Sequence, residues 1–327
     1  MSAARAGLER AAESLTGHAP ATYESHPLHA GSRDYAETNC YTDILIELLH
    51  ARGLEPLAAF SHLVRMDFEG DQWTFFKPPP EDIERLYGID IHEMQPYRPI
   101  PEQMAEQLAR GRTMIVELDS FFMPDTAATS YRSEHVKSSV IADAIDLDAQ
   151  RLAYFHGRGL HELGGEDYRA IFRIGDENPT HLPPYTELVR FDAGEPLGEE
   201  DLRAAALERL RHHLGRRPAT NPFERFGAAL SRDLPGLLSG GMEDFHAYAF
   251  ATVRMAGSAF EVAAAHARWL LGEAAREPAA AMDEIVAGCK ALSFRLARRR
   301  EFDPEERIAA LADAWTTAIG GLSERAG

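Results

Sequence analysis

The segment TNCYTDILIELLHARG, residues 38–53, decides how the first half of the chain is interpreted. Its apolar side chains recur at helical spacing: Tyr41, Ile44, Leu45, Leu48 and Leu49. Gly53 is a stop signal, and Thr38 is suited to the N-cap, so Asn39 and Cys40 are expected in the first turn. The free N–H groups and positive dipole end of a helix start stabilise a thiolate. Cys40 is therefore the leading candidate nucleophile, and the alternative is a small buried residue at a helix start.

Outward from this helix, the chain alternates between short apolar runs and helical patterns. Glu69-Gly70-Asp71 interrupts one apolar stretch, which predicts a strand, a turn and a strand over residues 56–80. TMIVELDSFFM, residues 113–123, is the clearest buried strand. The remaining expected elements are a helix at 81–87, an extended segment at 89–94, a helix at 101–110, a hairpin of 136–146 and 151–156, and a helix at 165–172.

The composition changes after residue 175. Residues 176–198 are rich in Pro, Gly and acidic residues, which is typical of a linker. Residues 199–327 are rich in Ala, Leu and Arg, and helical periodicity covers 199–214, 242–273, 276–298 and 304–323. The expected architecture is α+β, with an N-terminal arm at 1–35, a catalytic domain at 36–175, a linker at 176–198 and a helical domain at 199–327.

Charge and cysteine content exclude several classes of protein. The chain has 327 residues, and 34 Lys and Arg against 52 Asp and Glu give a net charge of −18. An acidic protein is a poor candidate for sequence-independent nucleic-acid binding. Two cysteines without a CxxC exclude a disulfide framework and a Cys-rich zinc site. No apolar run is long enough for a membrane span, and the N-terminus lacks a signal-peptide pattern, so we expect a cytoplasmic protein.

A thiol nucleophile needs a base within hydrogen-bonding reach, and His135 is the candidate. It precedes the expected strand at 136–146, so the order is a helix bearing Cys40 and then a strand bearing His135, as in papain. Asp119, at the end of the strand in VELDSFF, is the preferred carboxylate to orient the imidazole, ahead of His156. A solvated loop histidine is the alternative for His135, since the chain has 14 histidines.

Other features admit a simpler explanation beside a functional one. Trp73, Phe75 and Phe76 could line a substrate channel or form core. His26 and His29 form an HxxH pair, but a metal needs more ligands, so we expect solvated residues of the N-terminal arm and no metal site. The basic segment Ser293–Arg300 could dock an acidic partner, or it could be a solvated helix end.

Four segments carry a resemblance to a known family: TNCYTDILIELLHARGLEP (38–56), FEGDQWTFFKPP (68–79), MIVELDSFFMPDTAATSYRSEHVK (114–137) and RLAYFHGRG (151–159). They resemble a bacterial family related to the N-terminal domain of butirosin biosynthesis protein H, over most of residues 36–175. The resemblance implies a papain-like fold used for acyl transfer. Where that fold usually supplies Asp or Asn as the third catalytic residue, this sequence has His156.

Carried over by position, the resemblance gives each candidate a role. Cys40 would accept an acyl or aminoacyl group from the phosphopantetheine thioester of a carrier protein, and no other cofactor is expected. His135 would act as base and then acid, and Asp119 would orient it. Independently of the resemblance, the backbone N–H groups at the Cys40 helix start, aided by the Asn39 side chain, are expected to hold the oxyanion. A small molecule or peptide would be the acceptor.

Two alternatives to acyl transfer stay open. A cysteine peptidase or amidase of the same fold would differ only in whether water reaches the acyl-enzyme. A binding protein without catalytic activity could keep the fold and dock a carrier protein.

Overall fold

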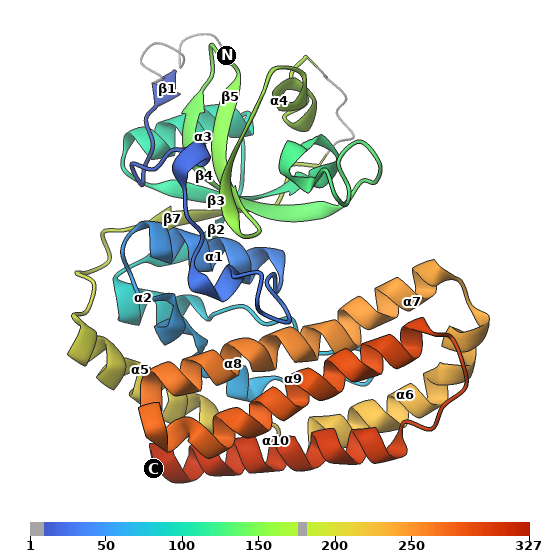
Figure 1. Cartoon of the computed structure of the whole chain (residues 1–327). Helices are drawn as coiled ribbons and strands as arrows, with labels where there is room; N and C mark the ends of the chain where they lie inside the picture. Colours follow the sequence, from blue (N-terminus) through green and yellow to red (C-terminus); the bar gives the residue numbers. More distant parts are fainter. Residues whose placement is uncertain (1–9, 176–181) are drawn as a thin grey trace. The chain divides into compact units, whose positions relative to one another are not determined.

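A computed structural model describes residues 10–175 and 182–327. The chain is α+β and divides into a unit built on an antiparallel sheet and a helical unit (Figure 1). The sheet unit comprises Asn39–Glu55 and the described parts of Met1–His29 and Ile83–Pro196. The helical unit comprises Leu197–Gly327 together with Ala30–Thr38 and Pro56–Asp82. These last two segments lie outside the expected helical range of 199–327.

The sheet has the strand order β2-β7-β3-β4-β5-β6, with β1 paired to β4, and every pairing is antiparallel. Its strands are β1 (Ala11–Ala12), β2 (Asp90–Met94), β3 (Thr113–Asp119), β4 (Lys137–Asp146), β5 (Arg151–His156), β6 (Gly159–Gly164) and β7 (Thr186–Arg190). The predicted hairpin of β4 and β5 is confirmed. β7 falls in the predicted linker, which is therefore wrong at that point: its buried TELV residues fill the place between β2 and β3.

Helices cover both faces of this sheet. The helices around it are α1 (Cys40–Ala51), α3 (Ile100–Ala109) and α4 (Gly165–Ile171), and α2 (Pro80–Tyr87) precedes β2. Short 3-10 turns in the unit are η2 (Pro20–Thr22), η3 (Pro27–His29), η5 (Ser120–Phe122) and η6 (Pro124–Thr126). α1 packs on β4 and β5, while α3 packs on β3 and β4 and α4 on β5 and β6.

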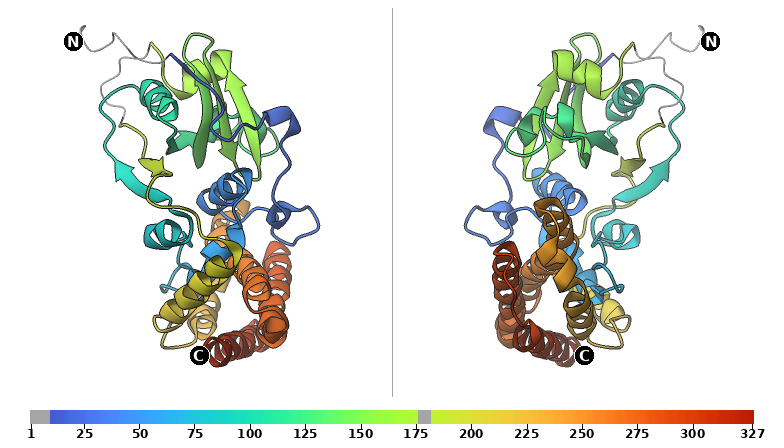
Figure 2. Two further views of the ribbon diagram at one scale, coloured as in Figure 1. Left: turned by 90° about the vertical axis from the view of Figure 1, so that its left-hand side faces the viewer. Right: turned by 90° about the vertical axis from the view of Figure 1, so that its right-hand side faces the viewer.

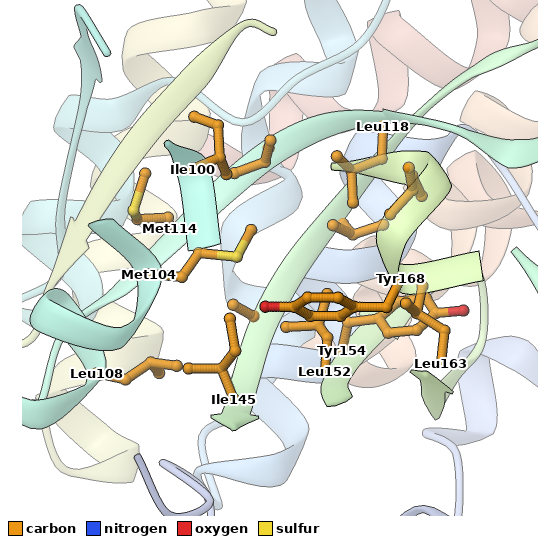
Figure 3. Close-up of a cluster of buried hydrophobic side chains, with 14 of the residues drawn as sticks. Ile100, Met104, Leu108, Met114, Leu118, Ile145, Leu152, Tyr154, Leu163 and Tyr168 are labelled. Atoms are coloured by element: carbon orange, nitrogen blue, oxygen red, sulfur yellow. The ribbon is translucent and has the colours of Figure 1, made fainter. Parts of the chain in front are cut away.

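One hydrophobic core cluster of the sheet unit lies between the sheet and the pair α3 and α4. Figure 3 shows Met104 and Leu108 of α3 and Tyr168 of α4 directed toward Tyr154 and the neighbouring strand residues. Alternate residues of each strand contribute to this layer, because successive side chains point to opposite faces. The intervening residues, such as Ser139 of β4, therefore face α1.

The helical unit contains more helices than its periodicity predicted. Its elements are η4 (Pro56–Arg65, 3-10), α5 (Glu199–Leu214), α6 (Pro222–Ser239), α7 (Met242–Ala249), η7 (Phe250–Arg254, a π-helix), α8 (Met255–Leu271), η8 (Gly272–Ala275, 3-10), α9 (Arg276–Ala297) and α10 (Glu305–Ala326). The helix at 199–214 is confirmed, α6 was missed, and 242–273 is a chain of shorter elements. Figure 2 shows α8, α9 and α10 packed alongside one another.

Residues 56–80 were expected to be two strands, and this prediction is wrong. PLAAFSHLVR forms η4, and only an isolated bridge between Phe68 and Trp73 remains of the expected pairing. A short apolar run does not distinguish a strand from a buried helical segment, and burial against α5 and α8 decided the outcome. None of the helices in residues 10–175 and 182–327 is long and apolar enough to cross a membrane.

Gly88 is a position in the sheet unit where only glycine fits. Its φ is +66°, and a Cβ built there would lie 2.1 Å from the carbonyl oxygen of Gly194. Gly88→Ala is therefore expected to lower the free energy of unfolding by about 2–4 kcal/mol, since backbone strain and a backbone clash add. Urea denaturation of the whole protein measures the loss.

Gly53→Ala is the matched control for this substitution. Gly53 has a similar φ of +70°, but nothing lies within 4 Å of the position that a Cβ would take there. We expect a loss of about 1–2 kcal/mol from backbone conformation alone. Equal losses for the two variants would contradict the close approach of Gly88 to Gly194.

Candidate active site

Cys40 is the first residue of α1. Asn39, not Thr38 as expected, is the N-cap: its backbone is extended, and its Oδ1 accepts a hydrogen bond of 2.9 Å from the Thr42 N–H. The Asn39 oxygen therefore caps the helix. Cys40 is half-buried, and its Sγ lies 3.6 Å from the Oγ of Ser139 on β4. The thiol thus sits at a helix start, against the face of the sheet that α1 covers.

A row of polar side chains continues along this face from Ser139. Ser139 pairs across the ladder with Glu117 of β3, and Lys137 pairs with Asp119. The Lys137 ammonium lies 2.7 Å from the Glu117 carboxylate. Cross-strand partners share a face, so Glu117 and Asp119 lie on the same side of the sheet as Cys40.

The structure brings His135 and Asp119 together. His135 Nδ1 lies 2.6 Å from Asp119 Oδ2, and the imidazole stacks on the Phe121 ring at 4.3 Å between centroids. Asp119 also accepts the Phe121 N–H through its other oxygen. With Nδ1–H donated to Asp119, Nε2 carries the lone pair that a general base requires. The His135 side chain is 67% exposed, so this nitrogen is reachable from solvent.

Cys40 and His135 are not in direct contact. Among the described residues no hydrogen bond joins them, and Ser139 is the partner of the thiol. Ser139 lies four positions after His135, which corresponds to about 13 Å of extended chain. The structure therefore assembles the base with its carboxylate but holds the thiol further along the same face.

His156 is engaged elsewhere. Its Nδ1 lies 2.5 Å from Asp125 Oδ2 and its Nε2 lies 2.7 Å from Ser138 Oγ, so it does not orient His135. Tyr154 also donates to Asp125. Burial opposes ionisation of Asp125, but the hydrogen bond and charge of His156 outweigh it and lower the pKa of this carboxyl. Asp125 thereby ties the loop before His135 to β5, a pairing that sequence spacing could not indicate.

Trp73 and Phe76, the expected channel residues, belong to the helical unit. Trp73 is 3% exposed and packs at 4.7 Å, between ring centroids, on Phe223 of α6. Phe76 is also buried, beside a small cavity of about 240 Å³ that His62 and Met66 help to line. Trp73 is thus a core residue of that unit. Because its ring is buried against α6, it does not line a substrate channel.

One opening near the candidate base lies at one end of the sheet. A cavity of about 510 Å³ is lined by His135, Asp119, Lys137, Arg173, Leu182 and Tyr185, among others. β3 ends at this point, and β4 and β7 begin there. A small molecule in this cavity would contact His135 directly, while Cys40 does not line it.

Comparison with known families accounts for nearly all of the chain. Residues 24–191 match the DUF1839 N-terminal domain, and residues 199–324 match the DUF1839 C-terminal domain. The chain belongs to the DUF1839 family. No curated protein matches the sequence. Cys40, Asp119 and His135 all lie within the DUF1839 N-terminal domain.

The DUF1839 N-terminal domain also holds a buried charged cluster behind Cys40. His29 hydrogen-bonds to Glu47 through Nδ1, and its Nε2 lies 3.3 Å from Asp43 Oδ1. Glu47 also accepts from the Tyr23 hydroxyl and the His26 N–H. Burial opposes protonation of His29, but hydrogen bonds and charges from Asp43 and Glu47 raise its pKa to about 9. This cluster fixes one face of α1, the helix that begins with Cys40.

His29 of the HxxH pair is buried, not solvated as expected, and the His26 N–H donates to Glu47 of the same cluster. No group of three or more His, Cys, Asp or Glu side chains suited to a metal ion occurs within residues 10–175 and 182–327. In the DUF1839 C-terminal domain, Cys289 is fully buried, and burial raises the pKa of its thiol to about 12. Cys289 is therefore expected to be inert, and it provides an internal comparison for Cys40.

Proposed function

We propose that this DUF1839 protein is a cysteine-dependent acyl- or aminoacyltransferase with a papain-like catalytic arrangement, related to butirosin biosynthesis protein H. One observation carries the proposal. The Cys40 thiol occupies the first residue of α1 and rests against β4, the strand that starts beside the His135–Asp119 pair. A thiol at a helix start and an imidazole held by a carboxylate are the two parts that thiol acyl transfer needs.

The reaction would proceed in two balanced steps. His135 takes the Cys40 proton, and the thiolate attacks the carbonyl carbon of a carrier-protein thioester. The new C–S bond forms, the bond to the pantetheine sulfur breaks, and His135 returns the proton to that sulfur. An amine then attacks the acyl-Cys40 carbonyl, His135 takes the amine proton through Nε2, and Cys40 leaves as thiolate. Free N–H groups at the start of α1 would bind the oxyanion, while Asn39 supports that start as its cap.

For this chemistry His135 must come closer to Cys40 than it lies in the free protein. Its exposed side chain allows that movement, and catalytic hydrogen bonds often form only when substrate is bound.

The distance between Cys40 and His135 is also the observation that favours a second candidate function, a non-catalytic module that binds a carrier protein. The exposed arginines near the end of α9, within Ser293–Arg300, would suit an acidic carrier.

Intact-protein mass spectrometry with a panel of aminoacylated carrier proteins tests the proposal. We expect a mass gain on the wild type and on Cys289→Ala, and none on Cys40→Ala. The size of the gain identifies the acyl group transferred. Cys289→Ala is the matched control, since it removes the chain's other thiol.

The opposite outcome supports the binding module. In that outcome no donor gives an adduct, but the carrier protein still binds. Iodoacetamide also labels Cys40 no faster than Cys289. A mass gain that persists in Cys40→Ala would instead place the nucleophile elsewhere.

A further inference from the structure

The cavity beside His135 has one apolar wall and an apolar rim. Ile100, Leu118, Ile171 and Phe172 contribute the wall. At the rim, Leu182 is 84% exposed, Val136 42% and Tyr185 39%. Large apolar side chains that gather at an opening and remain exposed mark a surface that is covered when a ligand binds.

Among the described residues that line the cavity, the charged groups leave one cation without a partner. Asp119 is bonded to His135, and Glu117 is bonded to Lys137. Arg173, just beyond α4, also lines the cavity, and its guanidinium makes no hydrogen bond or ion pair with any residue in 10–175 or 182–327. Since the other charges are paired, the ligand expected here is an anion that pairs with Arg173.

We propose that this cavity binds a monocarboxylate with an apolar chain, its carboxylate at Arg173 and its chain against Ile171, Phe172 and Leu182. A volume of about 510 Å³ lies in the range of small-molecule sites. Asp119 and Glu117, which also line the cavity, would repel a dianion more strongly than a monoanion, which disfavours phosphate esters. Binding does not require Cys40, which lies outside the cavity.

The ligand's role in a reaction rests on the proposed function. If acyl transfer occurs at Cys40, the acceptor would be an amine that also carries a carboxylate and an apolar chain, such as an aliphatic amino acid. It would bind in this cavity, and its amine would be deprotonated by His135 Nε2. The cavity itself predicts binding whether or not an acyl-enzyme forms.

Calorimetric titration of the full-length protein with butanoate, hexanoate and octanoate tests the inference. Affinity should rise by up to about fourfold for each added methylene until the apolar wall is covered. Arg173→Ala should weaken octanoate by about tenfold or more and leave octan-1-ol unchanged, since only the carboxylate pairs with the guanidinium. Leu182→Ser should weaken both ligands.

Arg169→Ala is the matched control. Arg169 is an exposed arginine of α4 and, unlike Arg173, does not line this cavity, so octanoate should bind this variant as it binds the wild type. No binding of octanoate at millimolar concentration, or equal losses for octanoate and octan-1-ol in Arg173→Ala, would overturn the inference. Octanoate binding by Cys40→Ala, together with no acyl-enzyme in the wild type, would sustain this inference and refute the proposed function.

Discussion

His135→Ala is expected to slow transfer from acyl-Cys40 to the acceptor amine by about 10²–10⁴-fold, the usual contribution of a positioned general base. The expectation rests on the Nδ1 contact with Asp119, which leaves Nε2 free to take a proton. Asp119→Asn should have a smaller effect in the same direction, because the amide can stabilise the wrong imidazole tautomer. Single-turnover mass spectrometry of isolated acyl-enzyme, mixed with acceptor, measures the rate.

His92→Ala is the matched control for this experiment. His92 is also an exposed histidine beside an aspartate, with Nδ1 3.3 Å from Asp90, but it lies on β2 at the far edge of the sheet. The transfer rate of this variant should equal that of the wild type. A normal rate in His135→Ala would show that another group accepts the proton and would remove His135 from the mechanism.

The second large effect concerns stability. His29→Gln is expected to lower the free energy of unfolding of the sheet unit by about 3–5 kcal/mol, because it leaves the Asp43 and Glu47 carboxylates buried without their cation. All three side chains are at most 3% exposed. Urea unfolding at pH 6, followed through hydrogen exchange of the α1 amides, measures the loss.

The same cluster makes stability depend on pH. The pKa of His29 is raised from 6.5 to about 9 in the folded protein. Its stabilising contribution is therefore complete below pH 6.5 and is lost as the pH rises through 9, an effect of about 3 kcal/mol. Wild-type stability should fall over this window, while His29→Gln should show a flatter profile.

His135→Gln is the control for both stability measurements. Its contact with Asp119 is largely exposed, so its loss should change stability by less than about 1 kcal/mol. Equal effects of the two substitutions would mean that the charged cluster behind α1 contributes no more than a surface pair.

Strong periodicity made some elements predictable. α1 and α5 repeat their apolar residues over several turns, and the β4–β5 hairpin has two apolar runs around a short polar turn. β7 has only five residues, TELVR, and lies in a segment dominated by Pro, Gly and acidic residues. The composition of that segment predicted a linker, and the strand was therefore missed. η4 was predicted as a strand because its apolar run is short and its helical form depends on packing against α5 and α8.

Those residues of the candidate site that have a recognisable local sequence context could be predicted. A cysteine at a helix start and a histidine before a strand are visible in sequence, and so is Asp119 at a strand end. The Ser138–His156–Asp125 network and the Ser139 contact depend on strand register, which brings together residues from distant segments. The role of Arg173 could not be predicted from the sequence, because a single arginine after a helix belongs to no recognisable motif.

The two units are interleaved along the sequence, which restricts how recombination could exchange one of them for another. Ala30–Thr38 and Pro56–Asp82 lie among sequence of the sheet unit but belong to the helical unit, where Trp73 and Asp82 join its core. A recombination event between residues 196 and 199 would transfer α5 to α10 without these segments, leaving Phe223 and His213 without their partners. We therefore expect the two halves to have diverged as a pair within one gene, with compensating changes between residues 56–82 and the C-terminal helices.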